Sequence, residues 1–121
     1  LVPDCGVTWI VPRLIGGARA RELALLGEKL PAETAQEWGL INRVFDDETL
    51  IEETEKVARK LAEGPSGQSF IRQAMWDSLD NNFETQLDRE RQLQLQAGQT
   101  GDFYEGVTAF LEKRAAKFTG N

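Results

Sequence analysis

The sequence predicts a mainly α-helical chain, and three observations lead to that prediction. Apolar residues recur at helical spacing through most of the 121 positions, most clearly over residues 48–63. Glycine and proline separate these stretches, as is typical of helix ends. Only residues 40–45 have the β-branched composition of a strand. Since a single strand has no partner inside the chain, we expect it to pair with protein outside this sequence or to be an extended connector.

Three short helices are predicted in the first part of the chain. They cover residues 8–15, 18–26 and 31–38, and a glycine follows each of them. Pro31 suits the first turn of the third helix, because its missing N–H would be unpaired there in any case. Residues 48–63 form a fourth predicted helix, with apolar residues on one face and charged residues on the other, and it ends at Gly64.

Two further helices are predicted in the rest of the chain. Apolar residues at four-residue steps indicate one long helix over residues 66–97, with a kink near Asn81 and Asn82. Asp102 is expected to cap the last helix, and Glu105 stands three residues later, in the position of a capping box. The apolar residues of this helix are expected to face inward; they are Val107, Phe110 and Leu111.

The composition disfavours several classes of function. Acidic side chains outnumber basic ones by 20 to 14, and the formal charge of -6 argues against nucleic acid or an anionic membrane as the main partner. No apolar run is long enough to span a bilayer. Because the chain has no histidine, it cannot supply a His-based nucleophilic site or a common zinc site, and no metal is expected. The single cysteine, Cys5, permits no internal disulfide and favours a cytoplasmic location.

The opening turn contains the best candidate for chemistry. Asp4 lies between Pro3 and Gly6 in an apolar turn, just ahead of the first predicted helix. A carboxylate in such a turn is costly unless it is paired, hydrogen-bonded or used in a reaction. The alternative interpretation is structural, with Asp4 capping the following helix or forming an Asx-turn.

Several motifs together carry a family resemblance. They are LVPDCG at residues 1–6, WIVPRLIG at 9–16, ARA at 18–20, LALLG at 23–27, AETA at 32–35, GLI at 39–41 and EGVTAFLEKR at 105–114. Their order resembles the second half of the enoyl-CoA hydratase/isomerase (crotonase) superfamily, and the similarity covers nearly the whole chain. Trp9 and the run EWGLI at residues 37–41 are most similar to its phenylacetate-degradation branch, the epoxyphenylacetyl-CoA isomerases.

The resemblance implies an α/β crotonase-like fold of which this chain is the C-terminal part. Residues 1–63 would be the end of the ββα spiral core with part of the acyl-CoA pocket, and residues 64–121 the helical region that builds homotrimers or hexamers. The N-terminal half, with the oxyanion-hole donors, would be missing. The absence of a starting Met agrees with that expectation. The partner would be an acyl-CoA substrate, which carries its own coenzyme A, and no separate cofactor is implied.

The resemblance also assigns a role to Asp4. Family members that shift double bonds resemble this chain in having an acid at this position, whereas typical hydratases have glycine there and use two upstream glutamates. Asp4 would then be the catalytic acid/base of an acyl-CoA isomerase, which opens an epoxyphenylacetyl-CoA ring or shifts an enoyl-CoA double bond. Two alternatives stay open: an enoyl-CoA hydratase, and a helical oligomerisation module with no activity of its own.

Three more residues are candidates for substrate binding. Phe110 and Lys113 match family residues that hold the adenine and phosphates of CoA, and a spacing of three places them on one helical face. Trp9 is a candidate to line the acyl pocket. The structural alternatives are core packing for Phe110 and Trp9, and a cation at a helix C-terminus for Lys113. The remaining basic group near the start is assigned to solvated faces or salt bridges; it comprises Arg13, Arg19 and Arg21.

Overall fold

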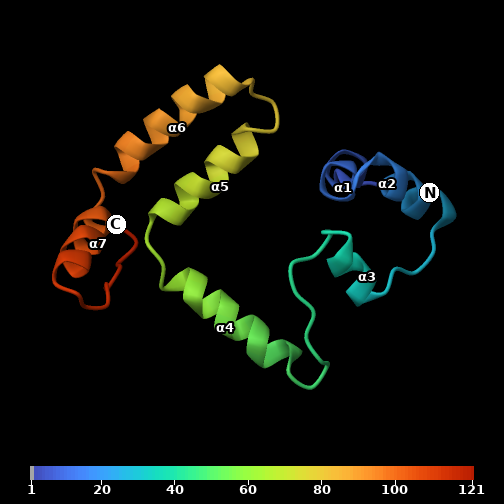
Figure 1. Ribbon diagram of the computed structural model, residues 1–121, viewed down its shortest axis with the longest axis horizontal. Coiled ribbons are helices and arrows are strands. Elements are labelled where there is room, and N and C mark those ends of the chain that lie inside the picture. The colour runs from blue at the N-terminus through green and yellow to red at the C-terminus, as the bar shows by residue number, and fades with distance from the viewer. Residues whose placement is uncertain (1) are drawn as a thin grey trace. The chain divides into compact units, whose positions relative to one another are not determined.

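The computed structural model describes residues 2–121, and within them it contains seven α-helices and no strand (Figure 1). The helices are α1 (Val7–Ile15), α2 (Gly17–Leu26), α3 (Ala32–Glu37), α4 (Leu50–Ala62), α5 (Gly67–Asp77), α6 (Phe83–Ala97) and α7 (Gly101–Leu111). The chain divides into two compact units, one ending at Thr54 and the other covering Glu55–Asn121. The expected division of function between residues 63 and 64 stays a prediction.

The first unit is built from α1, α2 and α3, and the three predicted helices are confirmed. Gly16, with φ 81° and ψ 156°, turns the chain sharply between α1 and α2, a conformation that favours glycine. Its N–H donates to the Pro12 carbonyl and so closes the end of α1. Three side chains of this unit are buried, one from each helix; they are Ile15, Ala20 and Ala35.

Within residues 2–121 no strand forms over residues 40–45, which leaves the connector of the two interpretations given above. Gly39, with φ 80°, reverses the chain after α3, and the N–H groups of Gly39 and Leu40 donate to the carbonyls of Gln36 and Ala35. These two bonds form a Schellman motif, which ends α3. The motif uses the backbone N–H of Leu40, the first residue of the predicted strand. Residues 40–46 are therefore an irregular connector.

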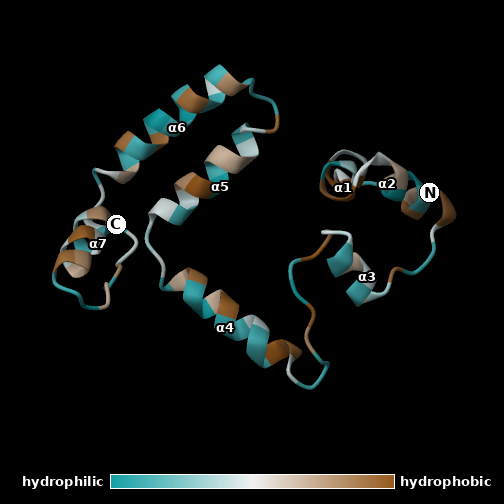
Figure 2. Cartoon of the chain, in the orientation of Figure 1, coloured by the Kyte–Doolittle hydropathy of each residue, from teal (hydrophilic) through white to brown (hydrophobic). Residues whose placement is uncertain are grey.

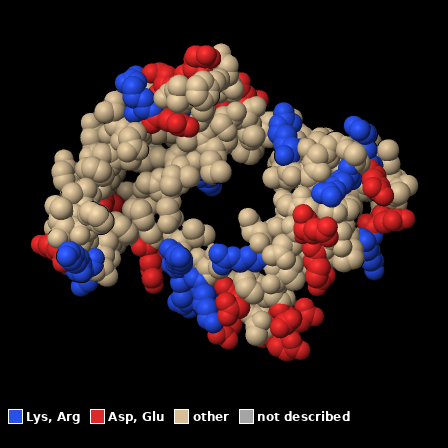
Figure 3. Space-filling model, in the orientation of Figure 1, with Lys and Arg blue, Asp and Glu red and all other residues tan. Residues whose placement is uncertain are grey.

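Helix α4 agrees with the prediction over residues 48–63. Its apolar and charged residues lie on different faces of the helix (Figure 2), and none of its residues is buried. The polar face carries charges of both signs, seen intermixed over α4 in Figure 3, including an ion pair of 3.5 Å between Glu55 and Arg59.

No helix within residues 2–121 is long and apolar enough to cross a membrane.

The prediction of a single long helix over residues 66–97 is wrong, because the structure has a helical hairpin there. Helices α5 and α6 lie side by side, joined through residues 78–82 (Figure 1). The Asn82 side chain accepts a hydrogen bond of 2.8 Å from the Thr85 N–H, and so it starts a new helix rather than kinking an old one. Arg89 of α6 forms an ion pair of 2.7 Å with Asp77 of α5, which links the two helices of the hairpin.

The last helix begins and packs differently from the prediction. Thr100, not Asp102, is its cap, because the Thr100 hydroxyl accepts from the Phe103 N–H at 3.1 Å. Ala109 is buried, whereas the apolar residues expected to face inward are exposed within the described chain; they are Val107, Phe110 and Leu111. The apolar face of α7 is thus not covered by residues 2–121, and burial in this helix follows Asp102 and Ala109 instead.

Candidate functional site

The opening turn has a well-defined backbone. The Asp4 carbonyl accepts the Val7 N–H at 3.0 Å, and the two residues between them, Cys5 and Gly6, both have positive φ values of 52° and 79°. The Gly6 carbonyl then accepts the first helical N–H groups of α1, from Trp9 and Ile10. A left-handed conformation costs a non-glycine residue such as Cys5 free energy, so the turn is a strained and specific structure.

The Asp4 side chain lies exposed beside this turn, which corrects the expectation of a carboxylate enclosed by apolar residues. Within residues 2–121 it makes no hydrogen bond or ion pair, and the cap position of α1 is Gly6, which has no side chain to cap with. The structural alternative for Asp4, a helix cap or an Asx-turn, is therefore not formed in the described chain. Within residues 2–121 its side chain is exposed.

Trp9 follows on the first turn of α1 and is half-buried. The Arg13 guanidinium lies 3.8 Å from the centre of the Trp9 ring and donates to the Trp9 carbonyl at 2.9 Å. The Arg19 guanidinium lies over the Trp38 ring, 5.0 Å from the ring centre. Two of the three early arginines thus stack on tryptophans, and all three are exposed, which agrees with their assignment to solvated faces.

Phe110 and Lys113 lie at the end of α7. Phe110 is in the last helical turn and is 81% exposed. Lys113 has left the helix and adopts φ 56°, so the two residues do not share a helical face as predicted. Both residues are exposed and lie at the same end of α7, where the Lys113 N–H donates to the Phe110 carbonyl at 3.2 Å.

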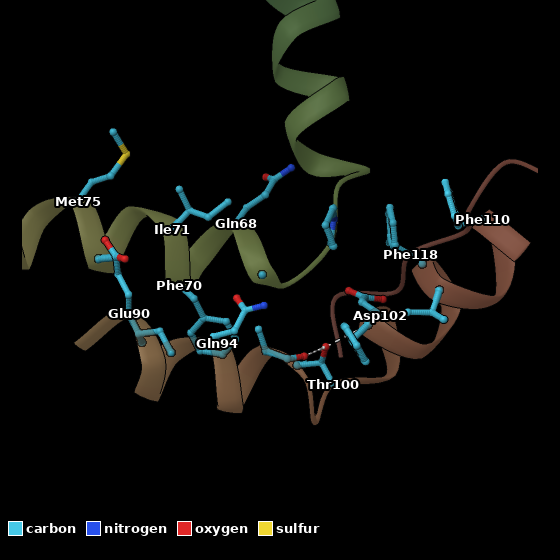
Figure 4. A pocket seen from close by; sticks show the side chains of 18 of the residues that line it. Gln68, Phe70, Ile71, Met75, Glu90, Gln94, Thr100, Asp102, Phe110 and Phe118 are labelled. Carbon is cyan, nitrogen blue, oxygen red and sulfur yellow. Dashed lines mark hydrogen bonds between the residues drawn. The ribbon is translucent and has the colours of Figure 1, made fainter. Parts of the chain in front are cut away.

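A cavity of about 820 Å³ lies between α5, α6 and α7 in the second unit (Figure 4). Phe110 and Phe118 stand at its α7 end, while Ile71 and Met75 project from α5. Its lining is mainly apolar, with Glu90 and Asp102 as the carboxylates. The sequence does not predict this cavity, because its apolar pattern indicates one continuous helix over residues 66–97.

Asp102 has a structural role different from the helix cap that the sequence predicts. It is 2% exposed, and its carboxylate accepts the backbone N–H groups of Ser66 (2.8 Å), Thr119 (2.7 Å) and Gly120 (3.0 Å). The Thr119 N–H and then the Ser66 N–H hold the pKa of Asp102 below its ordinary value of 3.8, against the opposing effect of burial. Asp102 therefore ties the start of α5 and the C-terminal tail to α7.

Glu105 was expected to complete a capping box, and this expectation is also wrong. Both of its carboxylate oxygens pair with the Arg114 guanidinium, and one also accepts the Lys117 N–H at 2.7 Å. No local pattern could have indicated these partners, which lie 9 and 12 residues away. Among residues 2–121 no group of three His, Cys, Asp or Glu side chains is arranged to hold a metal ion.

Comparison with known proteins decides the family. The sequence family described as Enoyl-CoA hydratase/isomerase matches residues 1–121, the whole of the sequence. The chain belongs to the enoyl-CoA hydratase/isomerase family. The predicted resemblance is thereby confirmed, and the chain is a C-terminal part of the crotonase fold that this family adopts.

Individual members of the family are closely similar. The 1,2-epoxyphenylacetyl-CoA isomerase of Escherichia coli (strain K12) is 52% identical over 121 residues, which are 99% of this chain and 46% of that protein. A probable enoyl-CoA hydratase of Rhodobacter capsulatus is 44% identical, over 99% of this chain and 47% of that protein. The crystal structure of an enoyl-CoA hydratase subunit from Geobacillus kaustophilus superposes with a TM-score of 0.94 at 34% identity, covering all of this chain and 48% of that one. The chain thus spans about half the length of these relatives.

Proposed function

We propose that this chain is the C-terminal half of an acyl-CoA isomerase that opens the ring of an epoxyphenylacetyl-CoA or shifts the double bond of an enoyl-CoA. The observation that carries the proposal is the Asp4 carboxylate. It stands exposed and unpaired within the described residues, on a turn whose backbone is fixed by two left-handed residues. The 52% identity to a 1,2-epoxyphenylacetyl-CoA isomerase supports this choice of reaction.

In the proposed reaction Asp4 moves or steers a proton at the acyl chain. General acid–base groups typically contribute about 10²- to 10⁴-fold to a rate. The negative charge that develops on the thioester oxygen needs separate stabilisation, and each oxyanion donor is worth roughly 2.7–4 kcal/mol. We place those donors in the half of the protein that lies outside this sequence. Residues 1–121 alone would then be nearly inert, and no cofactor besides the CoA of the substrate takes part.

Binding of the CoA moiety is proposed for the corner at the end of α7. The Phe110 ring is exposed enough to stack on an adenine, and the Lys113 ammonium is suited to a phosphate. Within the first unit, the half-buried Trp9 ring, against which Arg13 stacks, is proposed to contact the acyl group. Replacing Lys113 with Ala should weaken CoA-ester binding, while Lys60→Ala, which removes the same charge from exposed α4, should not.

Assembly into a homotrimer or hexamer is proposed for the second unit. Large apolar side chains around its cavity are exposed, among them Ile71, Met75, Phe110 and Leu111. Exposed apolar surface of this extent commonly marks contacts with other protein. Sedimentation of the full-length protein tests this proposal, since a stable monomer would contradict it.

An enoyl-CoA hydratase is the second candidate, and the 44% identity to a probable enoyl-CoA hydratase favours it. The two reactions place different demands on Asp4, because only the isomerase uses it as the acid/base. Asp4→Asn in the full-length protein should reduce isomerase turnover by about 10²-fold or more while acyl-CoA binding persists. Asp47→Asn, which neutralises another exposed carboxylate in the same unit, is the control. Unchanged turnover in the Asp4 variant would rule out its catalytic role.

A further inference from the structure

Lys113 occupies an unusual backbone position. It is the left-handed residue of a Schellman motif at the end of α7, where its N–H donates to the Phe110 carbonyl and the Arg114 N–H donates to the Ala109 carbonyl, at 3.2 and 3.0 Å. Glycine is the usual residue there, and a side chain costs about 1–2 kcal/mol in this conformation. Lys113 therefore stays at the corner only because surrounding contacts hold it.

Arg114, the next residue, supplies such a contact. Its Nη1 and Nη2 lie 2.7 and 2.9 Å from the two carboxylate oxygens of Glu105, a bidentate pair, while its Nε lies 2.6 Å from a Glu112 oxygen. The Arg114 and Glu105 side chains are 39% and 24% exposed. The Arg114 guanidinium, followed by the Lys117 N–H, lowers the pKa of Glu105 to about 2, so the pair stays charged across the neutral range.

The tail beyond Lys113 is held at two further points. Glu105 accepts the Lys117 N–H, and Asp102 accepts the N–H groups of Thr119 and Gly120. Asp102 and Glu105 are three residues apart, so they stand on one side of α7. Segment 114–120 is thus fastened along that side of the helix by two carboxylates, and Lys113 is the corner from which it starts.

We propose that Glu105 and Arg114 are positioning residues that hold the Lys113 ammonium in place for the CoA phosphates. The proposal rests on the proposed function of Lys113 and extends it to two residues that need not touch the substrate. Loss of the pair leaves α7 intact but frees the corner, so the affinity for the nucleotide part of CoA falls while the reaction at the acyl end continues.

The test compares two substrates in the full-length protein: the acyl-CoA, and the same acyl group on pantetheine, which lacks the adenosine and its phosphates. Arg114→Ala and the isosteric Glu105→Gln should raise KM for the acyl-CoA by roughly 10- to 100-fold, with kcat and the pantetheine-ester kinetics unchanged. Arg114→Lys should restore part of the loss. Arg91→Ala is the control: it breaks the exposed ion pair with Asp88 on α6 and should leave KM and kcat unchanged for both substrates.

The outcomes separate this inference from the function on which it rests. If Lys113→Ala discriminates between the two substrates but Arg114→Ala and Glu105→Gln do not, the positioning role is wrong and the CoA role of Lys113 stands. If Lys113→Ala also fails to discriminate, both are wrong. Equal losses with both substrates in the Glu105 and Arg114 variants would indicate a general role in stability and would overturn the inference.

Discussion

Replacing Gly6 with Ala tests whether the opening turn directs Asp4. Gly6 has φ 79°, and a methyl group added there would meet only the Ile10 Cδ1, at 3.8 Å, which is an ordinary contact. The cost therefore comes from the backbone alone, about 1–2 kcal/mol for a left-handed L-residue. Such a cost lowers the ratio of the native turn to its alternatives by a factor of roughly 5–30, which sets the upper limit on the loss of correctly formed turn. Turnover should fall by up to that factor, because Asp4 would be aimed correctly in fewer molecules.

The matched control is Gly27→Ala at the end of α2. Gly27 also has a positive φ, 66°, and an added methyl group would meet nothing within 4 Å, so the two variants carry the same kind of backbone cost. Both should lose similar free energy of unfolding in urea titrations of the full-length protein, while only Gly6→Ala loses isomerase turnover. Equal activity in the two variants would refute the claim that the turn serves Asp4.

Three further predictions concern the second unit. Lys113→Gly should be about 1 kcal/mol more stable than Lys113→Ala, because only glycine relieves the left-handed strain. Both variants should bind acyl-CoA equally weakly. Differential scanning calorimetry measures the first difference and equilibrium binding the second. Glu105 has its pKa lowered from 4.5 to about 2, so its contribution to stability is full above pH 4.5 and is lost as the pH falls towards 2. Glu105→Gln should accordingly show a shallower loss of stability over that range in acid titrations followed by circular dichroism. Asn82→Ala should destabilise α6 by roughly 0.5–2 kcal/mol but Asn82→Gly by only a few tenths, as measured by chemical denaturation; equal losses would argue against the cap.

Features that depend on neighbouring residues were predictable from the sequence. The first three helices and α4 were predicted to within about two residues, because their ends are set by glycines and by the apolar period, which are local signals. Residues 40–45 could be predicted only as a strand paired outside the chain or as a connector, and within residues 2–121 they are a connector that follows the Schellman motif at Gly39. Apolar four-residue steps continue through both α5 and α6, so periodicity alone could not reveal the hairpin; the cap at Asn82 was the local signal.

Contacts between distant residues were not predictable. Asp102 stands at a position that suits a helix cap, and only the fold brings Ser66, Thr119 and Gly120 to it, over separations of 36, 17 and 18 residues. Burial was misjudged for the same reason. Asp4 was expected to be enclosed and is exposed, while Phe110 was expected to face inward and is also exposed. Hydropathy indicates which side chains can be buried, but not which part of the protein covers them.

The family could be inferred from motif order, and the comparisons confirm it, whereas the roles of Asp4, Phe110 and Lys113 remain proposals. The mass of the product is the most direct test of the reaction. An isomerase converts its acyl-CoA into a product of the same mass, whereas a hydratase adds one water. For the full-length protein with epoxyphenylacetyl-CoA or an enoyl-CoA we predict a product of unchanged mass, whose formation is lost in Asp4→Asn. A product heavier by one water, or undiminished isomerisation by the Asp4→Asn variant, would contradict the account.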